Sequence, residues 1–314
     1  MKKIKLGFIG GGRHAEPAHI QKMLSIEEVE IVGCFDPDVK VFERVEKNYG
    51  FKMKSFANEK ELLKNCDAVI ISSPDEFHFQ QLKTAVEMGV HTLVEKPVCT
   101  KAEELTALEV LMSENPDVVI TTCYPRRFDL PYIMAEKYLD TQDYGKILKV
   151  ELTLRKKQNV NPETYDNSAL QDHLCHEIDI MSYICGGYSP FVMHKLVDGP
   201  YRYEVAGVRD DGISFSFANQ YFLDDAKDNL EEIKIYLEKE VITLTSVGGS
   251  NEFKVYLGDK FLMTWSRDMN RAYLDVNKSF VYSVLGKFPT YVSRKELSVS
   301  ASVILMKLTD TLKF

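Results

Sequence analysis

Three consecutive glycines follow a short apolar run near the start of the chain, and this arrangement restricts the fold strongly. Residues Ile4–Ile9 have the composition of a buried strand, and Gly10, Gly11 and Gly12 come directly after it. Apolar residues at helical spacing follow, which predicts a helix. Gly10 permits a tight turn, Gly12 leaves room for a ligand beside the backbone, and Ala15 allows close helix packing. A G-x-G-x-x-A pattern between a strand and a helix is typical of a dinucleotide-binding βαβ unit.

A carboxylate stands at the end of the second predicted strand, which covers Glu30–Phe35. Asp36 follows this strand, close to the offset at which an acidic residue accepts hydrogen bonds from the adenine ribose. Because a carboxylate repels a 2′-phosphate, the sequence favours NAD over NADP. Arg13 could tolerate that phosphate, so NADP is not excluded. Asp36-Pro37-Asp38 would also suit a turn and a helix N-cap, and the two roles are compatible.

Predicted strands and helices alternate through the first 123 residues. Helices are predicted over 39–49, 58–63, 79–88 and 102–112, and further strands over 51–56, 68–72, 91–94 and 118–123. The strand at 68–72 is almost entirely apolar, which is typical of a parallel sheet covered on both faces. This alternation predicts an α/β Rossmann domain, a doubly wound parallel sheet with right-handed crossovers, over residues 1–123.

A lysine follows the strand at 91–94, in the sequence Glu95-Lys96-Pro97. Pro97 ends the strand because it has no N–H to donate to the ladder. Ligands of open parallel sheets bind at the carboxyl ends of the strands, so Lys96 is a candidate for holding a reacting oxygen. A surface lysine at a strand end is the alternative for Lys96 taken alone.

Residues 124–314 predict a second, α+β domain with a large, mostly antiparallel sheet. Its predicted strands cover 147–154, 213–218, 233–237, 241–247, 253–257 and 261–265, and its helices cover 131–139, 170–184, 269–285 and 294–312. The last helix could pack back on the first domain. Residues 159–168 are polar and irregular, which predicts a loop lining a cleft.

The helix at 170–184 carries an acid and a histidine one turn apart. Asp172 and His176 share a helix face, so the carboxylate can fix the imidazole tautomer and leave the other nitrogen for proton transfer. An exposed helical ion pair is the alternative. A zinc site built from His173, Cys175, His176 and Asp179 is disfavoured because a helix places these residues on different faces.

Composition narrows the class of partner. The chain has 314 residues, of which 45 % are hydrophobic and 27 % charged, with a net charge of −8, and this argues against nucleic acid or an anionic membrane as the main partner. No apolar run approaches the roughly 20 residues of a membrane helix, and the start does not read as a signal peptide. The six cysteines form no C-x-x-C pair, so reduced thiols and a cytoplasmic location are expected.

The combined motifs resemble the Gfo/Idh/MocA family of NAD(P)-dependent oxidoreductases that act on sugars and cyclitols. The matching positions are Gly10-x-Gly12-x-x-Ala15, Asp36, Ser73-Pro74 with His78, Glu95-Lys96-Pro97, Arg127-Phe128-Asp129-x-Pro131, and Asp172-x-x-x-His176 followed by Asp179. The resemblance covers nearly the whole chain. It implies hydride transfer between NAD(H) and a secondary alcohol or ketone, with His176 as the base, Asp172 holding it, and Lys96 at the reacting oxygen.

The resemblance also implies which residues contact each ligand. The cofactor would be bound by Gly10, Gly11, Gly12, Arg13, His14, Asp36, Ser72, Ser73, Pro74, His78, Glu95 and Lys96. The substrate would be bound by Lys96, Tyr124, Arg127, Tyr165, Asp172 and His176, and no metal is expected. In the family the large sheet often carries the oligomer interface, so a homodimer or homotetramer is expected.

The chain departs from the family pattern near the catalytic helix. Asn167-Ser168-Ala169 stand where glycines often precede the aspartate, and Leu174 replaces a frequent glycine. Because of these differences near the substrate cleft, the resemblance does not identify the substrate. A redox-neutral NAD-dependent sugar enzyme, such as a glycosidase, and a non-catalytic NAD-binding regulator are the alternative functions.

Overall fold

The computed structural model describes residues 3–141, 143–157, 169–187, 189–199, 201–221 and 225–287. The described residues form two compact units: the first contains those up to Phe128 and those from Met269 to Lys287, and the second contains those from Asp129 to Asp268. The helix that begins at Met269 therefore groups with the N-terminal residues. The boundary after residue 123, and the separate roles given to the two domains, stay predictions. The expected helix at 294–312 and the loop at 159–168 lie outside the described residues.

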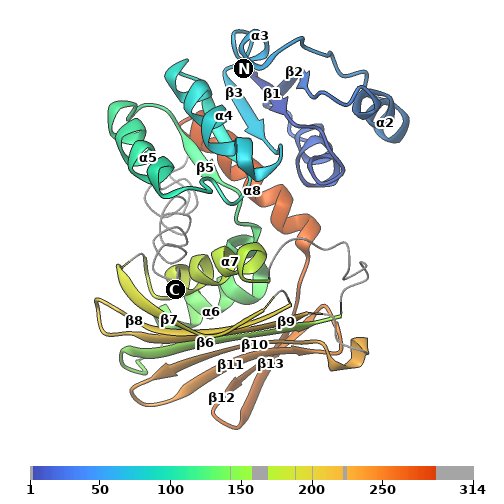
Figure 1. Cartoon of the computed structure of the whole chain (residues 1–314). Helices are drawn as coiled ribbons and strands as arrows, with labels where there is room; N and C mark the ends of the chain where they lie inside the picture. Colours follow the sequence, from blue (N-terminus) through green and yellow to red (C-terminus); the bar gives the residue numbers. More distant parts are fainter. Residues whose placement is uncertain are drawn as a thin grey trace. The chain divides into compact units, whose positions relative to one another are not determined.

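The first unit contains the predicted parallel sheet (Figure 1). Its strands are β1 (Ile4–Ile9), β2 (Val29–Phe35), β3 (Ala68–Ile71), β4 (His91–Val94) and β5 (Ile120–Thr122). They pair in the order β2-β1-β3-β4-β5, and every pair is parallel. Since β2 and β3 lie on opposite sides of β1, the strand order reverses there. Ligands of such sheets bind at this switch point, beyond the carboxyl ends of the strands.

The prediction of a strand at 51–56 is wrong. This segment contributes a single bridge between Ser55 and Cys34. The Cys34 N–H donates to Lys54 O over 2.8 Å and the Phe56 N–H donates to Cys34 O over 3.0 Å. Because both hydrogen bonds go to one residue of β2, no ladder forms, and the sheet has five strands rather than six.

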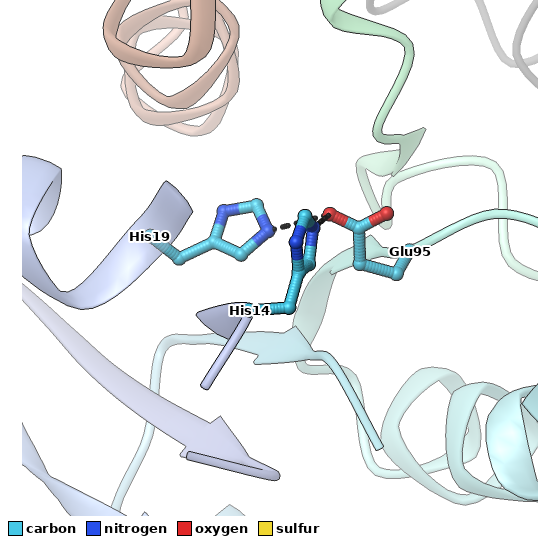
Figure 2. Close-up of side chains that lie close together, drawn as sticks. All are labelled: His14, His19 and Glu95. Carbon is cyan, nitrogen blue, oxygen red and sulfur yellow. Dashed lines mark hydrogen bonds and ion pairs between the residues drawn. The ribbon is translucent and has the colours of Figure 1, made fainter. Parts of the chain in front are cut away.

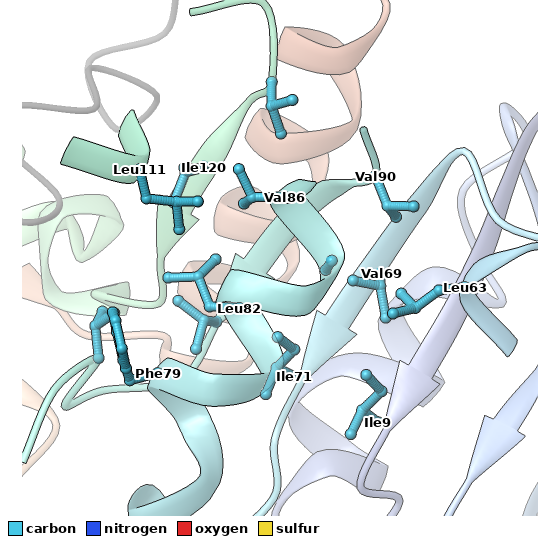
Figure 3. Close-up of a cluster of buried hydrophobic side chains, with 14 of the residues drawn as sticks. Ile9, Leu63, Val69, Ile71, Phe79, Leu82, Val86, Val90, Leu111 and Ile120 are labelled. Atoms are coloured by element: carbon cyan, nitrogen blue, oxygen red, sulfur yellow. The ribbon is translucent and has the colours of Figure 1, made fainter. Parts of the chain in front are cut away.

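Helices cover both faces of this sheet, as predicted for a doubly wound fold. They are η1 (Glu16–Ile20, a π-helical turn), α1 (Gln21–Met23), α2 (Lys40–Tyr49), α3 (Glu59–Leu63), α4 (Asp75–Glu87), α5 (Ala102–Glu114) and α8 (Met269–Val284). Val69 and Ile71 of β3 pack with Leu82 of α4 in one apolar cluster (Figure 3). Ala68 and Ile70 belong to a second cluster, which also contains apolar residues of α1, α2 and α8. This alternation follows from the two-residue period of a strand.

The second unit is built on an eight-stranded sheet. Its strands are β6 (Ile147–Lys156), β7 (Phe191–Gly199), β8 (Arg202–Arg209), β9 (Ser214–Tyr221), β10 (Leu230–Leu237), β11 (Val241–Val247), β12 (Glu252–Leu257) and β13 (Lys260–Ser266). The order is β13-β12-β11-β10-β6-β9-β8-β7, and among these pairs β6 and β9 alone are parallel. This confirms the large, mostly antiparallel sheet.

Strands β7 and β8 were not expected from the sequence. Their apolar residues do not alternate cleanly, since Val192, Leu196 and Val208 are all exposed. The described part of this unit also contains helices α6 (Leu130–Thr141) and α7 (Ala169–Ile184) and the short turn η4 (Ala226–Asp228), while η2 (Pro125–Phe128) closes the N-terminal part of the first unit. Among the described helices, none combines the length and apolar character required to cross a membrane.

Candidate cofactor site

A cavity of about 580 Å³ lies at the carboxyl ends of β1, β2 and β3, within the first unit. It is therefore at the switch point of the sheet. The lining residues are Ile9, Gly10, Gly12, Arg13, His14, Ala15, Phe35, Asp36, Pro37, Glu59, Ser72, Ser73, Pro74, Phe77 and Gln81. Eight of the twelve residues expected at a cofactor line it. Among the described residues, Gly11, His78, Glu95 and Lys96 lie outside this lining.

The glycine turn has the shape that a pyrophosphate requires. Gly10 has a φ of +85°, and a Cβ there would lie 2.6 Å from the backbone nitrogen of Ser73. A Cβ on Gly12 would meet no atom within 4 Å, although Gly12 lines the cavity. Ala15 is fully buried, so the following helical turn packs closely against the sheet. The space beside Gly12 fits a ligand that approaches the backbone amides.

Alanine substitutions at these two glycines are expected to have different effects. Gly10→Ala should lower the free energy of unfolding by about 1–3 kcal/mol, because its conformation is strained for other residues and the β3 end is too close. Gly12→Ala should leave folding unchanged but weaken NADH binding, because its methyl group would fill the ligand's space. Urea unfolding and NADH fluorescence titration measure the two effects. Equal NADH affinity in Gly12→Ala and the unmodified protein would contradict this assignment.

Asp36 connects the end of β2 to the glycine turn. Its Oδ2 accepts the Gly11 N–H over 2.7 Å and its Oδ1 accepts the Asp38 N–H over 2.8 Å. Each carboxylate oxygen has a second lone pair, so ribose hydroxyls can still donate to Asp36. On the other side of the turn, Arg44 donates to Gly11 O over 3.2 Å and pairs with the buried Glu16. The peptide groups of Gly11 are thus hydrogen-bonded from two directions.

A chain of polar side chains lines another part of the cavity. Ser73 Oγ donates to Gln81 Oε1 over 2.5 Å, and Gln81 Nε2 donates to Glu59 Oε1 over 2.7 Å. Ser73 was predicted from its place after β3. Glu59 and Gln81 were missed, because they come from α3 and α4 and no local motif marks them.

His78 lies next to the site but does not line the cavity. Only 2 % of its surface is exposed, and its Nδ1 and Nε2 each lie 2.8 Å from a backbone carbonyl, those of Pro97 and Ser73. The imidazole therefore connects the loop after β3 to the loop after β4. A role at the cofactor itself stays a prediction.

Glu95, directly after β4, is in contact with two histidines (Figure 2). Its Oε1 lies 3.1 Å from His14 Nε2 and 2.9 Å from His19 Nε2. Burial alone would raise the pKa of Glu95, but the hydrogen bonds from His14 and His19 hold that pKa well below its usual value. The hydrogen bond with Glu95 raises the pKa of His14. His19 was missed in the sequence, although it lies only five positions beyond His14.

The remaining predicted residues are distributed over both units. Lys96 is half-buried, two positions beyond β4. Tyr124 and Arg127 are buried, with the guanidinium carbon 6.0 Å from the centre of the tyrosine ring. His176 is half-buried on α7, and its ring centre lies 6.0 Å from that of His173. Asp172 is on the same helix, and Tyr165 lies outside the described residues.

The six cysteines and the residues of the alternative zinc site all lie in the described part of the chain. All six cysteines are free thiols, as expected. Among the described residues, the ligand-type side chains that lie close enough together to share an ion are His14, His19 and Glu95, rather than the group around His176. Hydrogen bonds between the two imidazoles and the carboxylate account for this clustering.

Comparison with known sequences identifies the first unit. Residues 4–122 match the model of an oxidoreductase family with an NAD-binding Rossmann fold, Gfo/Idh/MocA, which confirms the resemblance noted in the sequence. An inositol 2-dehydrogenase/D-chiro-inositol 3-dehydrogenase of Shouchella clausii is 24 % identical over 184 residues, 58 % of this chain and 53 % of the relative. A UDP-N-acetylglucosamine 3-dehydrogenase of Acidithiobacillus ferrooxidans is 27 % identical over 186 residues, 59 % of this chain and 56 % of the relative. The matched part of the chain thus spans little more than half the length of these relatives.

Solved structures share the fold over almost the whole chain. The scyllo-inositol dehydrogenase of Lactobacillus casei, with bound NAD(H) and scyllo-inositol, superposes with a TM-score of 0.79 at 18 % identity, covering 99 % of this chain and 96 % of that one. The structure of the Acidithiobacillus ferrooxidans enzyme gives a TM-score of 0.78 at 20 % identity, covering 100 % and 97 %. At this level of identity the likeness shows the fold alone, including the second unit.

Proposed function

We propose that this protein, whose residues 4–122 belong to the Gfo/Idh/MocA oxidoreductase family with its NAD-binding Rossmann fold, is a dehydrogenase. It would transfer a hydride between NAD(H) and a secondary alcohol or ketone of a sugar, cyclitol or sugar derivative. The observation that carries this proposal is the cavity at the switch point, where Gly12 leaves space beside the backbone and Asp36 offers a carboxylate. Relatives named as inositol and sugar dehydrogenases support the substrate class.

NAD(H), when bound, accepts or donates the hydride, and the chain orients it. The glycine turn would hold the pyrophosphate, and Asp36 would accept hydrogen bonds from the adenine ribose. Arg13 and His14 line the same cavity and are exposed, so both can contact the cofactor's phosphates or ribose.

Three residues would take part in the reaction of the alcohol, two of them directly and the third through His176. Lys96, beyond the carboxyl end of β4, would donate a hydrogen bond to the reacting oxygen and stabilise its developing negative charge. His176 would remove the hydroxyl proton as the hydride leaves the same carbon. Asp172, one helical turn before His176 on α7, would hold the imidazole and stabilise its protonated form.

The preference for NAD is expected to depend on Asp36. Asp36→Ser should weaken NAD binding by about 10- to 100-fold, since a hydrogen bond to a charged group contributes roughly 1.5–3 kcal/mol, and should narrow the gap to NADP. Asp38→Ser is the matched control, because Asp38 is exposed and does not line the cavity. Fluorescence titration of each protein with NADH and with NADPH measures the two affinities, and from them the preference for one cofactor over the other. Tighter NADPH binding in the unmodified protein would contradict the assignment.

A substrate panel tests the activity itself. Polyols, sugars and nucleotide sugars would be incubated with NAD or NADP, and the absorbance of the reduced cofactor followed. Net NADH formation with one class of alcohol supports the dehydrogenase. Turnover of a glycoside without net NADH would indicate the redox-neutral enzyme, and NADH binding without any turnover would indicate a regulator.

We further propose that the protein works in the cytoplasm as a homodimer or homotetramer assembled through the eight-stranded sheet. Exposed apolar side chains on this sheet, Val192, Leu196 and Val208, support an interface there, and the free thiols suit a reducing compartment. Light scattering of the purified protein measures the mass in solution, and a monomer would exclude the interface.

A further inference from the structure

The Glu95 carboxylate, directly after β4, has several hydrogen-bonding partners. Its Oε1 is within hydrogen-bond distance of His14 Nε2 and His19 Nε2, and its Oε2 accepts the Lys96 N–H over 3.3 Å (Figure 2). Glu95 is only 7 % exposed. A buried carboxylate is stable only when such donors replace water.

The orientation of Asn277 determines what His19 can donate. Asn277 Nδ2 lies 2.9 Å from Ala18 O and 2.7 Å from Tyr273 O, and both carbonyls only accept hydrogen bonds. The amide nitrogen must therefore face them, which leaves Oδ1 as the atom 3.1 Å from His19 Nδ1. Consequently, His19 Nδ1 carries a hydrogen and donates it to Asn277.

The other ring nitrogen of His19 faces a carboxylate, which also only accepts. A neutral imidazole has a single N–H, and it is already used at Asn277. An unprotonated Nε2 would direct its lone pair at Glu95 Oε1 over 2.9 Å, which is repulsive. The geometry thus requires one additional proton between His19 and Glu95, so that His19 donates from Nδ1 to the Asn277 amide oxygen and from Nε2 to the Glu95 carboxylate.

We infer that His19 and Asn277 are positioning residues: they hold the Glu95 carboxylate at the end of β4 and thereby fix the peptide that carries Lys96. Asn277 lies on α8, so the last described helix of the chain is hydrogen-bonded through His19 to the loop beyond β4. His14 connects the same carboxylate to the cofactor cavity, which it lines. The inference rests on the proposed role of Lys96 in hydride transfer.

The test compares His19→Gln and Asn277→Leu with a control. The glutamine can donate one hydrogen bond but cannot carry the charge, and the leucine removes the acceptor of His19 while keeping His19 itself. Ser283→Ala is the matched control, since it removes a hydrogen bond within α8 to Ser279 O, away from the cluster. His19→Gln is expected to lower kcat by about 10²-fold, with unchanged NADH affinity, because a displaced catalytic group costs about that factor.

Amide hydrogen exchange gives a second readout that needs no substrate. The peptide containing Lys96 should exchange faster in His19→Gln and Asn277→Leu than in the control, whereas a β3 peptide of the same variant should not change. Exchange that is unchanged at Lys96, or that rises equally in β3, would overturn the inference. If no alcohol is oxidised, the proposed function fails, and exchange still decides the positioning role. If His19→Gln does not fold, Asn277→Leu decides it alone.

Discussion

Replacing Lys96 with alanine is expected to lower turnover by about 10²–10³-fold, the factor usually lost with one hydrogen-bond donor to a developing oxyanion. NADH affinity should change little, because Lys96 lies outside the lining of the cofactor cavity. The measurement is steady-state kinetics on the active alcohol, with NADH binding measured separately by fluorescence.

Lys83→Ala is the matched control for this experiment. Lys83 is a partly exposed lysine of α4 that pairs with Glu87 one turn away, so its loss should leave turnover unchanged. Wild-type turnover in Lys96→Ala would exclude the lysine from the reaction. An equal loss in both variants would indicate a general effect of charge rather than a role at the reacting oxygen.

His176→Ala is expected to lower turnover by about 10²–10⁴-fold, the usual contribution of a general acid–base group. Asp172→Asn should also lower turnover, because in the proposed mechanism it would remove the charge that stabilises the protonated imidazole and would favour the wrong tautomer. The rate of alcohol oxidation should rise with pH as the imidazole of His176 loses its proton. The measurement is the pH dependence of kcat for the three proteins.

His194→Ala provides the control, since His194 is an exposed histidine on β7 of the same unit. Turnover at the wild-type level in His176→Ala would show that another residue is the base, and Tyr165 would then be the next candidate. A pH profile that is unchanged in His176→Ala would lead to the same conclusion.

The local features of the site were predictable from the sequence because neighbours in the chain create them. Strand, glycine turn and helix follow one another within 20 residues, so Gly10 and Gly12 could be placed at the cavity before the structure was known. Asp36 could be placed there as well, because it ends a strand that is parallel to the first. The almost entirely apolar run at 68–72 predicted a strand covered on both faces, which the two clusters confirm.

Tertiary structure alone decided the features that join distant segments. Residues 51–56 have the composition of a strand, but they reach only Cys34, so no ladder forms. Strands β7 and β8 lack a clean alternation and are defined by their pairing with each other and with β9. Alternation of apolar residues in the sequence indicates that one face of a strand is buried. A hydrogen-bonded ladder also requires a neighbouring strand at the right distance, which the sequence of one segment does not show.

The support of Glu95 is the clearest case of this difference. The sequence Glu95-Lys96-Pro97 identified a strand end with a candidate lysine, but nothing near it in the chain indicates His19 or Asn277. These two side chains are 258 residues apart and lie 3.1 Å from each other in the fold. Hydrogen bonds of this kind depend on the final packing of α8 in the first unit, so no local pattern can encode them.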